Sequence, residues 1–569
     1  MILRLMKMMF WMTFTRRPII GIYGFTSSSA NKATFQVTRL LHPKYCGGTI
    51  RASTTTGSYL YESKTGEDTT TSSSTTISTK DNNSSKGLAT SLLPRVILKR
   101  NRMTKMFRDG SQVVFSGSIS SVVSSSSSSL VKLGDLVQVE VLQETQKTNK
   151  KKNSNDDDDE KSNTTPPSST TLVGWGVYNP TSMYRVRILC HSLWHPKLML
   201  DDDGGGEDEI DETLVVLERI LVRNFQKALQ TRQALGFPSS SVTDTFRLVN
   251  GEGDFLSGLA VDVIGNQVAV VMSSAGWCQI HKTTILKCLQ QVLPQHYKLI
   301  WKTTESRLKQ DGYNYDKDDV DVDDDEENHI GDSNDDDSQQ QQPVIALENG
   351  IRYQTFPYQK QGQKTSVYCD QRENRLMVAS LCHGKNVLDL CCYHGGFSLN
   401  AAKHGAIKVV GVDSSQDAID TCRVNVKLND FDDDTAKISF VKMDISEYMK
   451  SCPDQYQVIV LDPPKLAPNE KALPRATRKY HSLNRDAIQL IDDEHGGLFL
   501  TCTCSAAMTQ KDGGRYFLET IQQASVAARR EITLLRVSGA AACHTQSPFS
   551  FPAGNYLTAA LFMVHPKRT

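Results

Sequence analysis

Five short apolar segments between residues 387 and 505 end in side chains that could do chemistry. Four of them stop at a carboxylate and the fifth at a thiol, namely Asp389, Asp413, Asp444, Asp462 and Cys504. In a parallel sheet the carboxyl ends of the strands lie along one rim, so these side chains would line one crevice. Carboxylates favour a bound cation, and a thiol beside it could act as a nucleophile.

The turn after the first segment predicts the kind of ligand. Gly395 and Gly396, between Tyr393 and Phe397, would let the backbone approach a ligand closely. The G-x-G-x-x-G pyrophosphate fingerprint is absent from this turn, which argues against a dinucleotide. The crevice is therefore predicted to bind the adenosyl sulfonium S-adenosylmethionine.

Two further strand ends extend this interpretation. Asp413, followed by Ser414, is placed to accept both ribose hydroxyls, and Asp444, followed by Ile445, could accept from the adenine amino group. Each aspartate taken singly could equally be the N-cap of a helix. Helix capping alone is much less able to explain why all four aspartates stand at the ends of predicted strands.

The stretch Asp462-Pro463-Pro464-Lys465 follows a strong β run. Its two prolines hold the turn rigid, so that the carboxylate can face a planar base. Methyltransferases that act on amino groups usually have an aromatic residue after such a turn, and Lys465 stands there instead. This difference disfavours an exocyclic amine as the acceptor.

The position of Cys504 suggests a reaction at carbon 5 of a pyrimidine. That carbon becomes nucleophilic only after a thiolate has added at carbon 6, so the reaction needs a cysteine near the methyl group. A cationic neighbour such as Lys465 would favour the thiolate. Cys502 would face the same side of a regular strand and is the competing nucleophile, and a buried structural cysteine is the alternative for either.

Composition favours an intracellular protein with a polyanionic partner. Formal net charge is zero, but 26 of the 64 acidic residues lie in three patches, Asp156–Glu160, Asp201–Glu212 and Asp316–Asp337. Outside these patches and the first 61 residues the basic surplus is about +17, which favours nucleic acid over a merely solubilising surface. The 13 cysteines show no regular pairing and no C-x-x-C pair that would support a zinc site, so we expect reduced thiols and no metal.

The N-terminus has the composition of a targeting segment. From Met1 to Tyr61 there is no acidic residue, while eight Arg and Lys residues recur among Ser and Thr. This pattern is typical of an organelle transit peptide, and we expect a mitochondrial rather than a plastid destination. A cleaved secretory signal, alone or before a plastid transit segment, is the alternative. The apolar stretch Met8–Phe14 is too short to span a bilayer, so no membrane association is expected.

Patterning along the chain divides it into four parts. We expect a transit and Ser/Thr-rich segment over 1–92, a small β-barrel over 93–192 with a polar insert at 143–171, a central α+β domain over 210–373 with an acidic insert at 314–342, and a parallel α/β domain over 374–569. Helical spacing is expected over Thr213–Leu235 and again over Ile280–Leu293.

Longer strings of residues resemble one known family. They are V-F-S-G-S-I at 114–119, G-V-Y-N-P-T-S at 176–182, F-R-L-V-N-G-E-G-D at 246–254, G-Q-K-T-S-V-Y-C-D-Q-R-E-N-R at 362–375, D-P-P-K at 462–465, K-Y-H-S-L-N-R at 479–485 and T-C-S at 503–505. The chain resembles the bacterial 23S ribosomal RNA cytosine-C5 methyltransferases that combine a PUA domain, a central α/β domain and a Rossmann-like methyltransferase domain.

This resemblance implies roles for particular residues. It implies that Cys504 attacks the base, that Asp462 orients the base or handles a proton, and that Asp413 and Asp444 contact adenosine. The family motifs also place further residues on the substrate side, namely Lys364, Arg372, Pro463, Lys465, Tyr480 and Asn484. The implied substrate is ribosomal RNA of an unassembled or partly assembled large subunit, because the base must be unstacked. A homodimer is considered beside the monomer.

The chain departs from the family pattern at several positions. Gln112-Val113 stand where Pro-Trp is typical, Phe255 and Ser257 replace Gly and Pro, Ser366 follows Q-K-T, and Ala506 follows T-C-S. These differences bear on how the RNA is placed more than on how the cofactor is bound. Two alternatives stay open: an RNA methyltransferase acting at another atom, such as a guanine nitrogen, with Cys504 structural, and a non-catalytic RNA-binding assembly factor.

Overall fold

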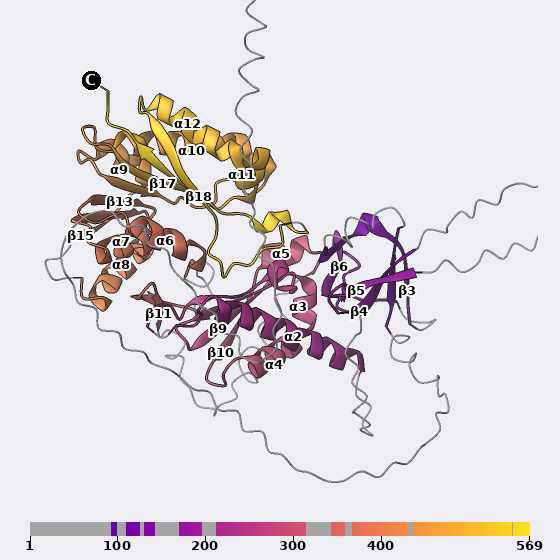
Figure 1. Cartoon of the computed structure of the whole chain (residues 1–569). Helices are drawn as coiled ribbons and strands as arrows, with labels where there is room; N and C mark the ends of the chain where they lie inside the picture. The colour runs from indigo at the N-terminus through magenta and orange to yellow at the C-terminus, as the bar shows by residue number, and fades with distance from the viewer. Residues whose placement is uncertain are drawn as a thin grey trace, which may run out of the picture. The chain divides into compact units, whose positions relative to one another are not determined.

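The structure, a computed structural model, describes residues 93–99, 110–125, 130–142, 170–195, 212–239, 241–314, 343–358, 367–431, 437–548 and 550–568. Within these residues, four sheets of six, four, two and seven strands carry the fold. Figure 1 shows how these elements follow one another along the chain. Lys364 and the transit-like segment lie outside the described residues.

The first sheet is built from six strands with alternating apolar residues. They pair in the order β2-β6-β5-β4-β1-β3. Their bounds are β1 (Arg95–Leu98), β2 (Val113–Phe115), β3 (Ile119–Val123), β4 (Leu136–Leu142), β5 (Thr170–Tyr178) and β6 (Tyr184–His191), with the short turn η4 (Ser116–Ser118). Val137, Val139 and Val141 of β4 are buried in one cluster, as the two-residue period of a strand requires. Strand β5 begins inside the stretch 143–171 that the sequence suggested was an insert.

The middle part packs helices on a four-stranded sheet of order β10-β9-β8-β7. The elements are α2 (Glu212–Ala234), β7 (Phe246–Asn250), η5 (Gly251–Asp254), β8 (Leu259–Ile264), β9 (Val268–Ser273), α3 (Gly276–Ile280), α4 (Lys282–Val292), β10 (Lys298–Thr303) and α5 (Glu305–Gln310), followed by the hairpin β11 (Val344–Glu348) and β12 (Ile351–Thr355).

Two details of this middle part differ from simple expectation. The helical stretch expected over Ile280–Leu293 is confirmed by α4, which begins two residues later because α3 ends at Ile280. The ring of the intervening His281 contacts the Gly134 carbonyl at 2.9 Å. Phe255 adopts a φ of 60° that glycine favours, and its ring packs edge-on against Trp194.

The third part is a doubly wound α/β sheet of order β15-β14-β13-β16-β17-β19-β18. Its elements are η8 (Cys369–Gln371), α6 (Arg372–Ala379), β13 (Asn386–Leu390), α7 (Gly396–Lys403), β14 (Lys408–Asp413), α8 (Gln416–Leu428), β15 (Lys437–Lys442), α9 (Ile445–Ser451), β16 (Val458–Leu461), η9 (Glu470–Ala472), α10 (Leu473–Gln489), β17 (Gly497–Thr503), α11 (Ala506–Gln510), η10 (Lys511–Gly514), α12 (Arg515–Ala527), β18 (Ile532–Ser538), η11 (Pro552–Gly554) and β19 (Thr558–Val564).

Helices cover both faces of this sheet, which explains the apolar runs in the sequence. The central strands β13 and β16 contribute residues to clusters on both faces, so nearly every residue of each strand is buried. The parallel sheet expected from the sequence is correct for β13–β17, whereas β19 runs antiparallel to both of its neighbours.

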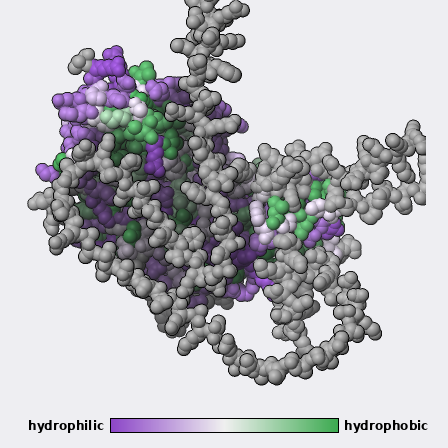
Figure 2. Space-filling model, in the orientation of Figure 1, coloured by the Kyte–Doolittle hydropathy of each residue, from purple (hydrophilic) through white to green (hydrophobic). Residues whose placement is uncertain are grey.

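Exposed apolar residues gather in two places (Figure 2). One green patch lies over α12 and β18, where Val526, Leu534, Leu535 and Val537 are exposed, and the other lies over the first sheet. None of the helices among the described residues combines the length and apolarity needed to cross a bilayer.

A buried arginine links the middle part to the α/β part. The Arg232 side chain is fully buried and pairs with both oxygens of Asp254, at 2.6 and 2.9 Å. The same guanidinium donates to the Cys543 carbonyl at 2.7 Å and to the Thr545 hydroxyl at 3.1 Å. One side chain therefore holds α2, η5 and the loop before β19 in register.

We expect Arg232→Met to lower the free energy of unfolding by about 3–5 kcal/mol, because Asp254 would keep a buried charge without its partner. Urea unfolding followed by circular dichroism would measure this. Lys287→Met is the matched control, because its ion pair with Glu218 is solvent-exposed and its loss should change stability little. If both substitutions lowered the free energy of unfolding equally, the stabilising role assigned to Arg232 would be contradicted.

Candidate active site

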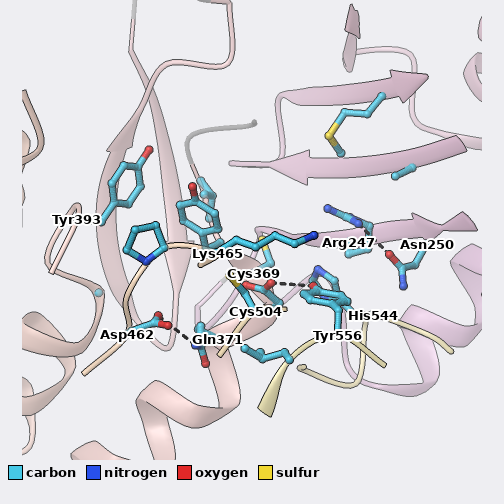
Figure 3. A pocket seen from close by; sticks show the side chains of 18 of the residues that line it. Arg247, Asn250, Cys369, Gln371, Tyr393, Asp462, Lys465, Cys504, His544 and Tyr556 are labelled. Atoms are coloured by element: carbon cyan, nitrogen blue, oxygen red, sulfur yellow. Dashed lines mark hydrogen bonds between the residues drawn. The ribbon is translucent and has the colours of Figure 1, made fainter. Parts of the chain in front are cut away.

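A cavity of about 1760 Å³ opens at the carboxyl ends of the strands of the α/β sheet. It extends to the middle part, where Arg247 and Asn250 line it, and to the loop before β19 (Figure 3). Its volume exceeds the about 300–1,000 Å³ typical of a pocket for one small molecule. The cavity therefore has room for more than one ligand.

Asp413 lies at the end of β14 and faces this cavity with Tyr393 and Ser414. One carboxylate oxygen accepts from the Tyr393 backbone N–H at 3.0 Å, and the other accepts from the Ser415 N–H at 3.0 Å. Tyr393 has a φ of 49°, so the turn after β13 bends its backbone toward β14. The two strand ends are thereby fixed to each other.

Asp444 and Ile445 also line the cavity, at the start of α9. Asp444 is the N-cap of this helix and accepts from the N–H groups of Ser446 and Glu447, at 2.8 and 3.3 Å. Burial alone would raise the pKa of Asp444, but these hydrogen bonds outweigh it and hold the pKa below its usual value. Asp444 therefore caps α9 and lines the cavity at the same time.

Asp389 does not line the cavity, unlike the other predicted carboxylates. It is fully buried one residue before the end of β13, and one oxygen accepts from both the backbone N–H and the hydroxyl of Ser398, at 3.0 and 2.7 Å. Burial raises its pKa to about 6. Strand alternation turns this side chain toward α7, where it fixes the first turn of the helix.

The glycine turn lies between Asp389 and α7. Gly395 has a φ of 80° and is the N-cap of α7 but does not line the cavity, whereas Gly396 and Phe397 do. A Cβ atom at Gly396 would come within 2.5 Å of the Arg375 guanidinium. Glycine is needed here for close packing as well as for the turn.

Asp462 follows β16 and lines the cavity, as do Pro463 and Lys465. Figure 3 shows Asp462 and Lys465 at the cavity. Its Oδ2 accepts from the Gln371 side-chain amide at 3.0 Å. Burial, reinforced by the charge of Asp370, raises the pKa of Asp462 to about 7. A carboxyl group with such a pKa can both release and accept a proton near neutral pH.

The structure separates the two candidate thiols. Cys502 is fully buried inside the sheet, and burial raises its pKa well above the usual value. Strand β17 ends at Thr503, so Cys504 leaves the strand direction and lines the cavity with a partly exposed side chain. Cys504 is thus the thiol that a ligand could reach.

Three residues expected on the substrate side are buried outside the cavity. Tyr480 is fully buried and hydrogen-bonds Thr503, at 2.8 Å, next to Cys504. Asn484 donates to the Tyr480 carbonyl one turn earlier. Arg372 contacts the Cys543 sulfur at 3.3 Å and lies over the Phe237 ring. These side chains support the site from behind.

The structure also adds residues that the sequence analysis did not single out. Asp370 and Gln371 line the cavity beside Asp462, and the Tyr556 hydroxyl donates to Asp370 at 2.7 Å. Asp370 and Gln371 lie in the D-Q-R-E-N-R string at 370–375, which is the local signal for them. His544 and Tyr556 come from the distant loop before β19, and no local pattern pointed to them.

The residues present fit an adenosyl sulfonium. Asp413, Asp444 and Asp462 place three carboxylates around one cavity, which suits a cation, and the turn from Tyr393 to Phe397 brings backbone to its edge. Within the described ranges no group of three or more His, Cys, Asp or Glu residues suits a metal ion.

Comparison with known proteins agrees with this fit. Residues 340–527 match the S-adenosylmethionine-dependent methyltransferase family model. Ribosomal RNA large subunit methyltransferase I of Enterobacter sp. (strain 638) is 30% identical over 67% of this chain and 85% of its own length, and that of Escherichia coli O9:H4 (strain HS) is 31% identical over the same shares. The solved structure of SMU.776 in complex with SAH is similar in fold, with a TM-score of 0.57 and 19% identity over 83% of this chain and 100% of that chain.

The chain is therefore an S-adenosylmethionine-dependent methyltransferase, and S-adenosylmethionine is its methyl donor.

We expect N-ethylmaleimide to label Cys504 and not Cys502 in the folded protein, because of these two thiols Cys504 lines the cavity and Cys502 is fully buried. Peptide mass spectrometry after brief labelling would show it. Cys452, partly exposed and outside the cavity, provides an internal control for reactivity. Labelling of Cys502 at the rate of Cys504 would contradict the arrangement.

We expect Asp462→Asn to stabilise the protein at pH 8, by about 4 kcal/mol at most. The folded-state pKa of about 7 lies above the unfolded value of about 4, so the stability of the wild type falls as pH rises between them. The variant lacks this titration, and its stability should fall less over the same range. Denaturant unfolding at pH 5 and pH 8 would compare the two proteins, and parallel pH dependences would contradict the raised pKa.

Proposed function

This chain belongs to the ribosomal RNA large subunit methyltransferase I family, and from that premise we propose that it forms 5-methylcytosine in large-subunit ribosomal RNA through a covalent adduct of Cys504. The observation that carries the proposal is that Cys504 and Asp462 line the same cavity. The two residues follow the adjacent strands β17 and β16 and line one cavity with the adenosine-side carboxylates.

The chemistry needs a nucleophile and a proton-handling group at the same base. The Cys504 sulfur forms a bond to carbon 6 of cytosine, which makes carbon 5 nucleophilic. S-adenosylmethionine, when bound, supplies an electrophilic methyl group on its sulfonium. Loss of the carbon-5 proton to a base then re-forms the double bond as the carbon–sulfur bond breaks, and Cys504 is regenerated.

Asp462 carries the proton that must move during these reaction steps. Electron density moves toward N3 of the ring as the thiolate adds, and a protonated carboxyl group at N3 stabilises it. With a pKa of about 7, Asp462 can take up the proton that leaves the Cys504 thiol and present it to N3. The pair then holds one proton in total at neutral pH.

The remaining cavity residues are assigned to the two ligands. We assign Asp413, Ser414, Tyr393, Gly396, Phe397, Asp444 and Ile445 to the cofactor, and Pro463 and Lys465 to the base. Asp389, Gly395, Arg372, Tyr480 and Asn484 position these residues from behind. The role of Lys364 at the RNA stays a prediction.

The proposed substrate is RNA in which the target base is unstacked. A base must leave its helix to reach a strand-end cavity, which favours unassembled or partly assembled ribosomal RNA. The basic surplus outside the acidic patches favours contacts to phosphates. We further propose that the first sheet is a PUA-like RNA-binding domain and that the N-terminal segment directs the chain to mitochondria rather than plastids.

The test is to incubate the protein with S-adenosylmethionine and ribosomal RNA transcripts containing 5-fluorocytidine. Fluorine cannot leave carbon 5 as a proton does, so the adduct should persist and map to Cys504 by mass spectrometry. Cys504→Ala should form no adduct and lose nearly all methyl transfer, while Cys502→Ala should keep both. Substantial methyl transfer by Cys504→Ala would instead favour another acceptor atom, such as a guanine nitrogen.

A further inference from the structure

We infer that Gln371, held by Asn374 and Ser538, is a positioning residue that fixes which oxygen of Asp462 exchanges the catalytic proton. The inference rests on the proposed function, because it concerns the proton that passes between Cys504 and the base. It assigns a role to the Asp370–Arg375 string that the reaction itself does not explain.

Three hydrogen bonds connect Ser538 to Asp462. The Ser538 hydroxyl donates to Asn374 Oδ1 at 2.7 Å, and Asn374 Nδ2 donates to Gln371 Oε1 at 2.7 Å. Gln371 Nε2 then donates to Asp462 Oδ2 at 3.0 Å, as the dashed line in Figure 3 shows. Asn374 and Gln371 are both 3% exposed, so water cannot readily replace these bonds.

These hydrogen bonds can run only from Ser538 as first donor to Asp462 as last acceptor. Asn374 Nδ2 also donates to the Gly539 carbonyl, at 3.1 Å, which cannot donate in return. Rotating the Asn374 amide would therefore set its oxygen against that carbonyl and against Gln371 Oε1. With Asn374 fixed, the Gln371 oxygen is occupied and only its N–H group can face Asp462.

Asp462 Oδ2 is consequently committed as an acceptor. No hydrogen bond within the described ranges engages Oδ1, so a proton on Asp462 resides on Oδ1. As Cys504 adds to carbon 6, its thiol proton passes to Oδ1 and from there to the hydrogen bond with N3. When the thiol leaves, the proton returns by the same route, so no proton is gained or lost in the exchange.

The charged and titratable groups around Asp462 oppose one another. Asp370 of η8 and Asp389 of β13 raise its pKa, while Arg375 of α6 and the Gln371 amide lower it, and burial is the largest effect. The thiols of Cys502, in β17, and of Cys504, just after it, lie in the same electrostatic neighbourhood. Gln371 is the neutral member of this set, so its removal changes the proton affinity of Asp462 without adding a charge.

The test is the pH dependence of kcat in Gln371→Leu, which has a similar volume but no donor. The pair of Asp462 and Cys504 is active when it holds one proton, so the rate of the wild type should rise with pH through the pKa of Asp462. Loss of a bond that favours the carboxylate raises this pKa, and the rising limb should move up by about one pH unit. The rate should fall several-fold at pH 6.5 and recover at pH 8.5.

Gln457→Leu is the matched control. Gln457 donates to Asp492 Oδ2 at 2.9 Å at the opposite end of β16, so it forms the same kind of pair away from the cavity. This variant should keep the wild-type pH profile. Calorimetry with S-adenosylhomocysteine should show unchanged affinity in both variants and so verify that the cofactor site is folded.

The outcomes separate the inference from the proposed function. A rate of Gln371→Leu that is unchanged, or reduced equally at all pH values, overturns the positioning role even if the 5-fluorocytidine adduct forms. A shifted rising limb without any adduct keeps the link between Gln371 and Asp462 but overturns the Cys504 mechanism. Recovery of the wild-type profile by Gln371→Asn would also contradict the inference, because the shorter side chain cannot span both partners.

Discussion

The repulsion among buried carboxyl groups at the carboxyl rim of the sheet is the constraint on which the site depends. Burial raises the pKa of Asp462 most, and the charges of the nearby Asp370 and Asp389 raise it further. In a medium of low dielectric such groups cannot all ionise without compensation. Compensation comes from the hydrogen bond of Ser398 to Asp389, from that of Gln371 to Asp462, and from the charge of Arg375. Together they leave Asp462 poised between its two protonation states.

The string Asp370–Arg375 serves as a junction because its side chains contact several parts of the molecule. Asp370 accepts from Tyr556, Gln371 donates to Asp462, and Arg375 pairs with Glu348 of the hairpin at 2.6 Å. Arg372 and Glu373 contact the loop around Cys543. A short helix start thereby ties the catalytic carboxyl to the hairpin and to the loop before β19.

Residues behind the cavity also position the nucleophile. Tyr480 holds Thr503, the last residue of β17, and Thr503 precedes Cys504 directly. A strand that ended one residue later would turn the thiol of Cys504 back toward the core, as Cys502 is turned. The reach of the nucleophile is therefore set by where the strand stops.

The sequence by itself determined the order of the elements and the chemistry along the rim. Runs of Val, Ile and Leu ending in Asp413, Asp444, Asp462 and Cys504 sufficed, because strand direction alone places the ends of parallel strands together. Only the tertiary structure decided that Asp389 faces Ser398 and that Tyr480 and Asn484 are buried. It also brought Gln371 and Tyr556 into the cavity, since such contacts depend on side-chain direction and on loops distant in sequence, which no local pattern encodes.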